Sequence, residues 1–279
     1  MTAPINPPDL DIALKSLWGA SQMPFSASVL KPYASDSFDQ TRHRLEQLVS
    51  VRACGLLHGP NGVGKSHLVQ HFLQALPDKR YKTLVLSHSS VTGTDLLRLL
   101  CLELGQTPRM RRSDNVLSIR QAWQQLDRLW PVVVLDEAQN LSAMALEEVR
   151  LLTCDRRDTQ PPFSLLLVGD EQLLPRLQMG INAPLLARLS FCLHLQPWTG
   201  QELTGYVQAR LQEVGIHANP FDAAALQLLL QAGNGLPRLF NHLAQRSLEE
   251  AAAQNSRAIT TAHVQRALEL LPWVTQLAQ

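Results

Sequence analysis

The stretch HGPNGVGKS at residues 58–66 limits the possible fold of this chain more than any other feature. A short apolar run precedes it and an amphipathic helical pattern follows it, so a strand, a loop and a helix are expected in that order. The pattern G-x-x-x-x-G-K-[ST] is satisfied by Gly59, Gly64, Lys65 and Ser66. In such a loop, backbone N–H groups converge at a helix N-terminus, where the helix dipole favours negative charge. The sequence therefore predicts a loop that cradles nucleotide phosphates, called here the P-loop (residues 59–66).

The composition permits a large folded core. The chain has 279 residues, 45% of them hydrophobic and 18% charged, which allows one large domain and a smaller one. A formal net charge of +1 excludes a surface that is basic throughout, so phosphate contacts would come from local clusters. The four cysteines form no CxxC pair, which argues against a cysteine zinc site or a disulfide framework. With neither a secretory signal nor an apolar run that spans a bilayer, we predict a cytoplasmic protein without a membrane partner.

Short apolar runs alternate with helical stretches from residue 40 to about residue 197, a pattern typical of a parallel α/β sheet. The expected strands cover residues 54–57, 83–87, 132–135, 164–168 and 191–195. After Pro197 only helices are expected, over residues 199–214, 221–232, 236–254 and 260–271. The predicted domains are an N-terminal extended arm or cap (1–39), an α/β nucleotide-binding core (40–197) and a small all-helical domain (198–279).

A second motif, WPVVVLDEAQNL, supplies a buried strand that ends in two acids. In a chain with a P-loop, Asp136 suits the carboxylate on the Mg²⁺ side, together with the hydroxyl of Ser66. Glu137 suits the base that polarises the attacking water, and Lys65 would hold the terminal phosphates. These assignments predict a Mg²⁺-dependent ATP hydrolase.

Two arginines and one further acid extend this prediction. Arg188, in NAPLLARLSFCLHL, closes a helix before the last expected strand, and Arg238, in GNGLPRLFNHLA, opens a helix of the C-terminal domain. Each can also be an ordinary surface arginine. Together with a P-loop, they match a trans-acting arginine finger and an arginine that senses the γ-phosphate. Asp170, in LLLVGDEQL, follows a strand and would contact the water or the γ-phosphate, although Asn, Thr or Gln is more usual there.

These segments together resemble the AAA+ ATPases across residues 40–271. The Pro24–Phe25 pair is similar to one found in a branch that contains ExeA-type secretion ATPases and the MuB/TniB-like helper ATPases of DNA transposition. Residues 136–173 resemble helpers encoded beside transposases. ExeA-type proteins usually continue into a membrane segment and a periplasmic domain, whereas this chain ends after the helical domain, which favours the transposition helper. The alternative is an ExeA-type secretion ATPase or another assembly ATPase that acts on a protein partner.

The resemblance implies ATP and Mg²⁺ as cofactors and an ATP-dependent oligomer, a ring or a filament, that binds target DNA and recruits or stimulates a transposase. It implies that Lys65, Glu137, Asp170 and Arg188 are catalytic and that Ser66 and Asp136 are metal ligands. The residues expected to contact the nucleotide are Gly59, Pro60, Asn61, Gly62, Val63, Gly64, Lys65, Ser66, His67, Asp136 and Arg238.

Double-stranded DNA is expected to bind at the segment TPRMRRSDN, which holds Arg109, Arg111 and Arg112. Pro108 and the polar run after it predict a loop and then a helix start, with Ser113 or Asp114 as the cap. Such a cluster can also be a solvated face or pair with acids of an adjoining subunit. Phosphate contacts carry no base information, so the predicted DNA recognition is largely independent of sequence.

Overall fold

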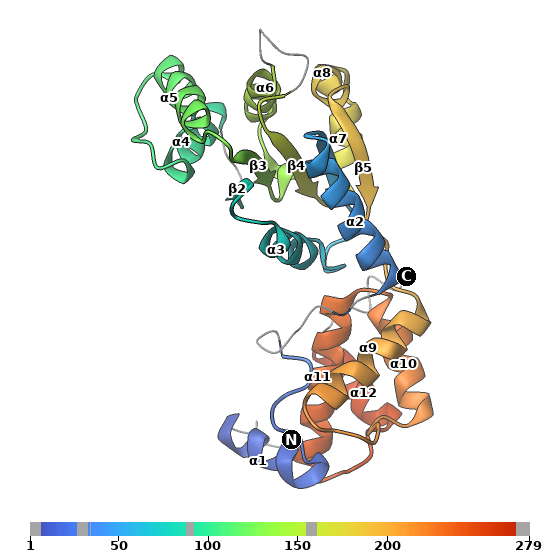
Figure 1. Ribbon diagram of the computed structural model, residues 1–279. Helices are drawn as coiled ribbons and strands as arrows, with labels where there is room; N and C mark the ends of the chain where they lie inside the picture. Colours follow the sequence, from blue (N-terminus) through green and yellow to red (C-terminus); the bar gives the residue numbers. More distant parts are fainter. Residues whose placement is uncertain (1–6, 27–32, 34, 88–91, 155–160, 272–279) are drawn as a thin grey trace. The chain divides into compact units, whose positions relative to one another are not determined.

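The computed structural model of the chain describes residues 7–26, 33, 35–87, 92–154 and 161–271 (Figure 1). These residues divide into two compact units. The α/β unit comprises Asp36–Pro60 and Lys65–Gln196, and the helical unit comprises the described parts of Met1–Ser35, Asn61–Gly64 and Pro197–Gln279. The middle of the P-loop is therefore grouped with the helical unit, whereas its two ends belong to the α/β unit.

A five-stranded parallel sheet forms the centre of the α/β unit, with the strand order β2-β3-β4-β1-β5. Its strands are β1 (Cys54–His58), β2 (Tyr81–Leu86), β3 (Trp130–Leu135), β4 (Ser164–Gly169) and β5 (Leu189–His194). The predicted parallel α/β core is thus confirmed. Strands β2, β3 and β5 begin two residues earlier than the apolar runs suggest, at 81, 130 and 189. The hydrogen-bonded pairing of β2 with β3 begins before the apolar residues, with Tyr81 opposite Trp130.

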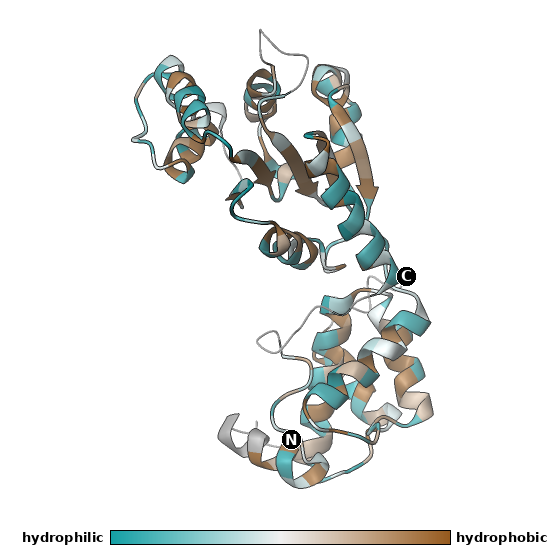
Figure 2. Cartoon of the chain, viewed as in Figure 1, coloured by the Kyte–Doolittle hydropathy of each residue, from teal (hydrophilic) through white to brown (hydrophobic). Residues whose placement is uncertain are grey.

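Helices cover the sheet of the α/β unit. They are α2 (Asp36–Ser50), α3 (Lys65–Ala75), α4 (Gly93–Glu103), α5 (Arg112–Gln125), α6 (Ala143–Leu152), α7 (Leu173–Gln178) and α8 (Ala183–Leu186), with the 3₁₀ turns η2 (Ala138–Asn140) and η3 (Gly180–Asn182). Alternate strand residues, such as Leu86, Leu135 and Leu167, share one apolar cluster with α4, α6 and α7. Their neighbours along each strand point to the opposite face. Figure 2 shows β3 and β4 in strong brown, as expected for strands buried on both faces.

The helical unit contains α1 (Pro7–Trp18), α9 (Gly200–Glu213), α10 (Ala223–Gly233), α11 (Pro237–Ala253) and α12 (Thr261–Glu269). The four C-terminal helices lie close to their predicted positions. Helix α9 begins at a capping box, in which Thr199 accepts the N–H of Glu202 and the Glu202 carboxylate accepts the N–H of Thr199. None of the described helices is both long and apolar enough to cross a membrane.

The segment predicted as an extended arm or cap contains helix α1, which contacts α11 in the helical unit, and α2 already begins at Asp36. Phe25 is only 2% exposed. Its ring centroid lies 6.0 Å from that of Phe240, 6.4 Å from Tyr206 and 6.5 Å from Phe221. The Pro–Phe pair noted in the sequence therefore anchors the N-terminal segment in the core of the helical unit.

Candidate nucleotide site

The P-loop joins β1 to α3, and its three glycines all have a positive φ, with Gly64 at 107°. Gly59 has a φ of 156°, and a Cβ there would overlap the backbone carbonyl of Leu195. Gly62 has a φ of 86°, a left-handed conformation that other residues rarely adopt. Its carbonyl accepts the backbone N–H of Arg238 at 3.2 Å, and a Cβ on it would press against the Arg238 side chain. Gly62 stands at one of the x positions of G-x-x-x-x-G-K-[ST], where any residue is allowed. The motif alone therefore does not show that glycine is favoured there.

Lys65, the first residue of α3, is buried, with 7% of its surface exposed. Its Nζ donates to the carbonyl of Gly59 at 2.8 Å and to that of Pro60 at 3.0 Å. A buried ammonium needs acceptors of this kind, because an unpaired buried charge is costly. The carbonyls hold the ammonium at the loop, where phosphate oxygens can replace them as acceptors.

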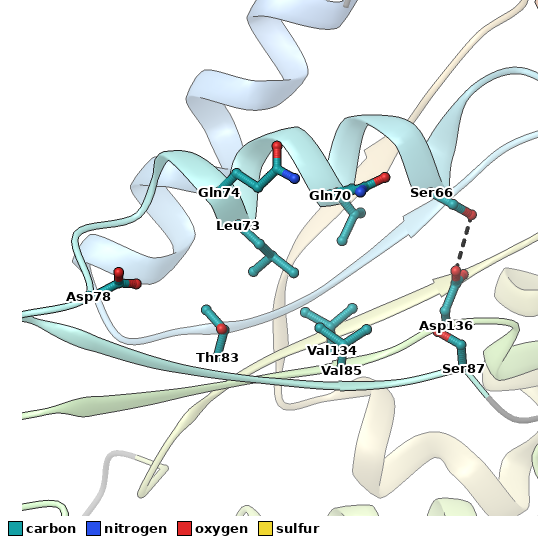
Figure 3. Close-up of a pocket in the computed structure, with 11 residues that line it drawn as sticks. Ser66, Gln70, Leu73, Gln74, Asp78, Thr83, Val85, Ser87, Val134 and Asp136 are labelled. Atoms are coloured by element: carbon teal, nitrogen blue, oxygen red, sulfur yellow. Dashed lines mark hydrogen bonds between the residues drawn. The ribbon is translucent and has the colours of Figure 1, made fainter. Parts of the chain in front are cut away.

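Ser66 and Asp136 meet although 70 positions separate them in the chain. The Ser66 hydroxyl donates to Oδ2 of Asp136 at 3.1 Å, as the dashed line in Figure 3 shows. The N–H of Asp136 donates to the Leu86 carbonyl at 2.8 Å, which continues the pairing of β2 and β3 by one residue. The two oxygens predicted to bind Mg²⁺ therefore lie together at the carboxyl ends of the strands.

Glu137 has a φ of 54°, which is unusual for a residue other than glycine. Its N–H donates to Oδ1 of Asp136 at 2.9 Å, and its Oε2 accepts Nε2 of Gln139 at 2.6 Å. Backbone outliers of this kind cluster at functional sites, where the surrounding structure holds them. Gln139 was not among the predicted site residues, although it stands in the same DEAQ tetrapeptide.

Asp170 follows β4 directly, as predicted, and its carboxylate accepts a hydrogen bond from within the same loop. Oδ1 accepts the N–H of Gln172 at 2.9 Å. The N–H of Asp170 donates to Oε1 of Gln139 at 3.2 Å. The loop after β4 is thus tied to the acidic end of β3 through Gln139, and the Asp170 side chain acts within this loop as a turn-forming acceptor.

Arg188 lies just before β5, at the amino ends of the strands, whereas the P-loop lies at their carboxyl ends. Its neighbour Leu189 pairs with Cys54, which begins β1, whereas the P-loop follows the last residue of β1. Burial raises the pKa of the Cys54 thiol to about 11, and the positive charge of Arg188 lowers that pKa slightly. Arg188 Nη1 donates to the Thr153 carbonyl at 3.4 Å, and the residue is exposed. The structure therefore separates Arg188 from the P-loop of its own chain.

The predicted DNA loop lies between α4 and α5, and its three arginines differ in their contacts. Arg109 and Arg111 are exposed, whereas Arg112 uses Nε and Nη2 to bind both carboxylate oxygens of Glu148, with Nη2 at 2.7 Å from Oε2. The side chain of Asn115 bonds to the N–H and to the carbonyl of Arg109, and so shapes the loop. The predicted helix cap is wrong: α5 begins at Arg112, and its N-cap, Arg111, makes no side-chain cap hydrogen bond.

A cavity of about 640 Å³ opens along α3 (Figure 3). Its described lining is Ser66, Val69, Gln70, Leu73, Gln74, Asp78, Thr83, Val85, Ser87, Val134 and Asp136. The Ser66–Asp136 pair lies at one end of this cavity and Asp78 lies toward the other (Figure 3). Because residues 59–64 do not line it, the cavity adjoins the predicted Mg²⁺ ligands and is distinct from the phosphate cradle.

Comparisons with known proteins agree with this geometry. The family model described as AAA domain matches residues 47–177, which include the P-loop and the acidic strand. The *Aeropyrum pernix* ORC2 protein, solved as ADPNP–ADP complexes, is similar at a TM-score of 0.65 and 17% identity, over 91% of this chain and 72% of that chain. The chain has the AAA+ fold. The *Aeropyrum pernix* ORC1 protein, solved in complex with DNA, shares this fold at a TM-score of 0.64 and 16% identity, over 87% of this chain and 66% of that one.

A curated protein is also similar to this chain. General secretion pathway protein A of *Aeromonas hydrophila* is 31% identical over 255 residues, which cover 87% of this chain and 45% of that protein. The chain therefore matches less than half the length of this relative.

Proposed function

We propose that this AAA+ chain binds ATP with Mg²⁺ and hydrolyses it at a site that a second copy of the chain completes. The observation that carries this proposal is the hydrogen bond from Ser66 to Asp136, which unites the P-loop with the acidic end of β3. A hydroxyl and a carboxylate at this point are oxygen ligands of the kind that would hold a Mg²⁺ ion beside the phosphates.

In the proposed reaction, Lys65 exchanges its carbonyl partners for phosphate oxygens and neutralises their charge. Ser66 and Asp136 would hold a Mg²⁺ ion, which would supply further charge neutralisation when bound. Glu137 accepts a proton from the attacking water, and the hydrogen bond from Gln139 holds its carboxylate in one orientation. Asp170 contributes through the position of its loop, since its carboxylate accepts an N–H within that loop.

The location of Arg188 supports a site shared between two copies. Strand β5 has six residues, so its two ends are roughly 17 Å apart at about 3.3 Å per residue. A guanidinium at the start of β5 is thus far from the P-loop end of its own sheet. An arginine finger supplied by a neighbouring copy is worth roughly 10³–10⁵ in rate.

ATP turnover by wild-type chain and by single variants tests the hydrolytic proposal. Glu137→Gln is expected to bind ATP and lose about 10²–10⁴-fold in turnover, because an amide does not accept the proton. Lys65→Ala is expected to lose tight ATP binding. The control is Glu147→Gln, which removes an acid of α6 that pairs with Arg150 and is expected to leave turnover unchanged. Wild-type turnover in both Glu137→Gln and Lys65→Ala would overturn the proposal.

We further propose that the ATP cycle acts on a protein partner. The support is the relative named for a general secretion pathway, which favours the alternative stated from the sequence over the transposition helper. The transposase partner and the cytoplasmic location remain predictions from the sequence, and no relative named above carries a transposition name.

A second candidate function is an ATP hydrolysis cycle that is coupled to the binding of duplex DNA. Its support is the exposed pair Arg109 and Arg111 beside Met110, which is 86% exposed, together with the AAA+ fold of the DNA-bound ORC1 protein. Measuring ATP turnover with and without duplex DNA separates the two candidates. Stimulation by DNA would favour the second, whereas turnover unaffected by DNA would favour a protein partner.

A further inference from the structure

Three side chains outside the Mg²⁺ pair converge at the carboxyl ends of neighbouring strands. His58 is the last residue of β1, His194 is the last residue of β5, and the two are register partners. Glu171 lies in the loop after β4, which pairs with the other side of β1. The parallel sheet therefore brings together two imidazoles and one carboxylate that are far apart in the chain.

The carboxylate of Glu171 lies between the two imidazoles. Its Oε1 is 2.9 Å from Nε2 of His194, and its Oε2 is 3.5 Å from Nδ1 of His58. The two rings are stacked, with centroids 4.6 Å apart and an interplanar angle of 12°. One possible ligand atom from each residue can be chosen so that all three lie within 4.8 Å of one another.

Glu171 makes a short hydrogen bond with His194, whereas its only approach to Nδ1 of His58 is the 3.5 Å contact of Oε2. The His58 side chain is 9% exposed, and among the described residues no group makes a hydrogen bond to its Nδ1. The 3.5 Å approach of Glu171 is long for a hydrogen bond. A buried polar atom without a good hydrogen bond is costly, so Nδ1 of His58 is available to a further ligand at this position.

Two of the three side chains have shifted pKa values. Burial lowers the pKa of His58, and the neighbouring His194 lowers it further. The hydrogen bond from His194 lowers the pKa of Glu171 below its usual range.

We propose that His58, Glu171 and His194 form a binding site for a divalent transition-metal ion of the zinc type. Two imidazoles and one carboxylate suit zinc, cobalt or nickel, whereas Mg²⁺ and Ca²⁺ prefer oxygen ligands alone. Ligand atoms on a tetrahedral zinc ion are roughly 3.3 Å apart, given Zn–N bonds of about 2.0–2.1 Å. The cluster must contract to reach this distance, and the half-exposed side chains of Glu171 and His194 have room to rotate. Three protein ligands leave a fourth position for water.

Such an ion would connect two loops of the candidate nucleotide site. His58 directly precedes Gly59 of the P-loop, and Glu171 directly follows Asp170. The positive charge of Lys65 also acts on His58, where it lowers the pKa of the imidazole. The bound metal would therefore hold the start of the P-loop against the loop after β4, independently of the Mg²⁺ pair at Ser66 and Asp136.

Equilibrium dialysis of the nucleotide-free chain against ZnCl₂, after removal of metal with a chelator, tests this site. Wild type is expected to bind one zinc ion, and CoCl₂ in its place is expected to give the visible absorption of low-coordinate Co²⁺. His194→Gln and Glu171→Gln are each expected to weaken zinc binding at least about tenfold. Both residues are partly exposed, so these variants are expected to fold, which circular dichroism checks.

Two controls separate this site from incidental binding. His43→Gln removes an exposed histidine that lies 3.5 Å from Glu46, and Cys192→Ser removes an exposed thiol from β5. Both are expected to bind zinc as wild type does. Absence of zinc binding by wild type, or equal zinc affinity in wild type, His194→Gln and Glu171→Gln, would overturn the proposal.

Discussion

The side-chain amide of Gln139 donates to Glu137 at 2.6 Å and accepts the backbone N–H of Asp170 at 3.2 Å. One residue therefore connects the acidic end of β3 with the loop after β4. A Cβ on Gly169 would lie only 2.6 Å from Oε1 of Gln139, so a larger residue at the end of β4 would displace this side chain. The orientation of the Glu137 carboxylate thus depends on a residue that has no assigned part in the reaction itself.

We expect Gln139→Ala to lower kcat for ATP by about tenfold and to leave KM nearly unchanged. A hydrogen bond to a charged group contributes about 1.5–3 kcal/mol, and its loss frees the Glu137 carboxylate to rotate. Steady-state ATP turnover measures both constants. Gln47→Ala, at an exposed position of α2, is the matched control. A changed KM with an unchanged kcat would show that Gln139 acts on nucleotide binding instead.

Mixing two inactive variants tests the shared site. Arg188→Ala chains keep Lys65, and Lys65→Ala chains keep Arg188, so a mixed interface can pair both intact residues. We expect each variant alone to be nearly inactive and the mixture to recover part of the ATP turnover. Turnover of wild type per chain should also rise with protein concentration. Full activity of Arg188→Ala alone would remove this residue from the reaction.

Replacing Arg109 and Arg111 together by alanine is expected to weaken binding to duplex DNA and to flatten its salt dependence. Each lost phosphate contact reduces the slope of log K against log salt by about 0.9. Fluorescence anisotropy at several salt concentrations measures this slope, with ATP present. Arg128→Ala is the control, because that side chain is 94% exposed and lies outside the loop. An unchanged slope would exclude the loop as a DNA surface.

Arg112 is expected to affect stability more than DNA binding. Its bidentate partner Glu148 has a side chain that is only 11% exposed, so Arg112→Ala leaves a mostly buried carboxylate without its cation. Since Arg112 itself is half-exposed, we expect a loss of about 1–2 kcal/mol in the free energy of unfolding. Urea denaturation measures it. Adding Glu148→Gln to Arg112→Ala is expected to restore part of the lost stability. An equal loss in the single and the double variant would argue against a stabilising ion pair.

Phe25→Ala is expected to lower the free energy of unfolding of the helical unit by about 3 kcal/mol or more. The ring is almost fully buried among Tyr206, Phe221 and Phe240, so its removal leaves a cavity. Urea unfolding followed by tryptophan fluorescence is a suitable measurement, because Trp198 lies in this unit. Ile12→Ala, at a position 67% exposed, is expected to have little effect. A stability equal to that of wild type would show that Phe25 does not anchor the segment.

The parallel sheet and the pairing of Ser66 with Asp136 follow from local patterns. Apolar runs mark the strands, and the P-loop and the acidic strand end are short motifs whose chemistry requires them to meet. The helices after Pro197 are equally visible, because glycines and capping residues bound them. Predictions of this kind succeed where the signal lies within one continuous segment.

Contacts between distant segments were not predictable in the same way. Nothing near Arg112 in the chain indicates Glu148 as its partner, and that ion pair changes the expected role of Arg112. The His58–Glu171–His194 cluster depends on the order of β4, β1 and β5, which a single sequence does not state. Helix α5 begins at Arg112 without a side-chain cap, although the polar residues after it had suggested a later start.

The two carbonyl groups that hold Lys65 also affect which ligands the P-loop accepts. Because Gly59 and Pro60 already satisfy the ammonium, an incoming anion must form stronger interactions than these carbonyls do. A polyphosphate meets this condition, since it presents several charged oxygens to the ammonium and to the N-terminus of α3 at once. Chloride or a single carboxylate offers less and competes poorly. These carbonyl contacts of Lys65 would therefore favour polyphosphates over small anions at the P-loop.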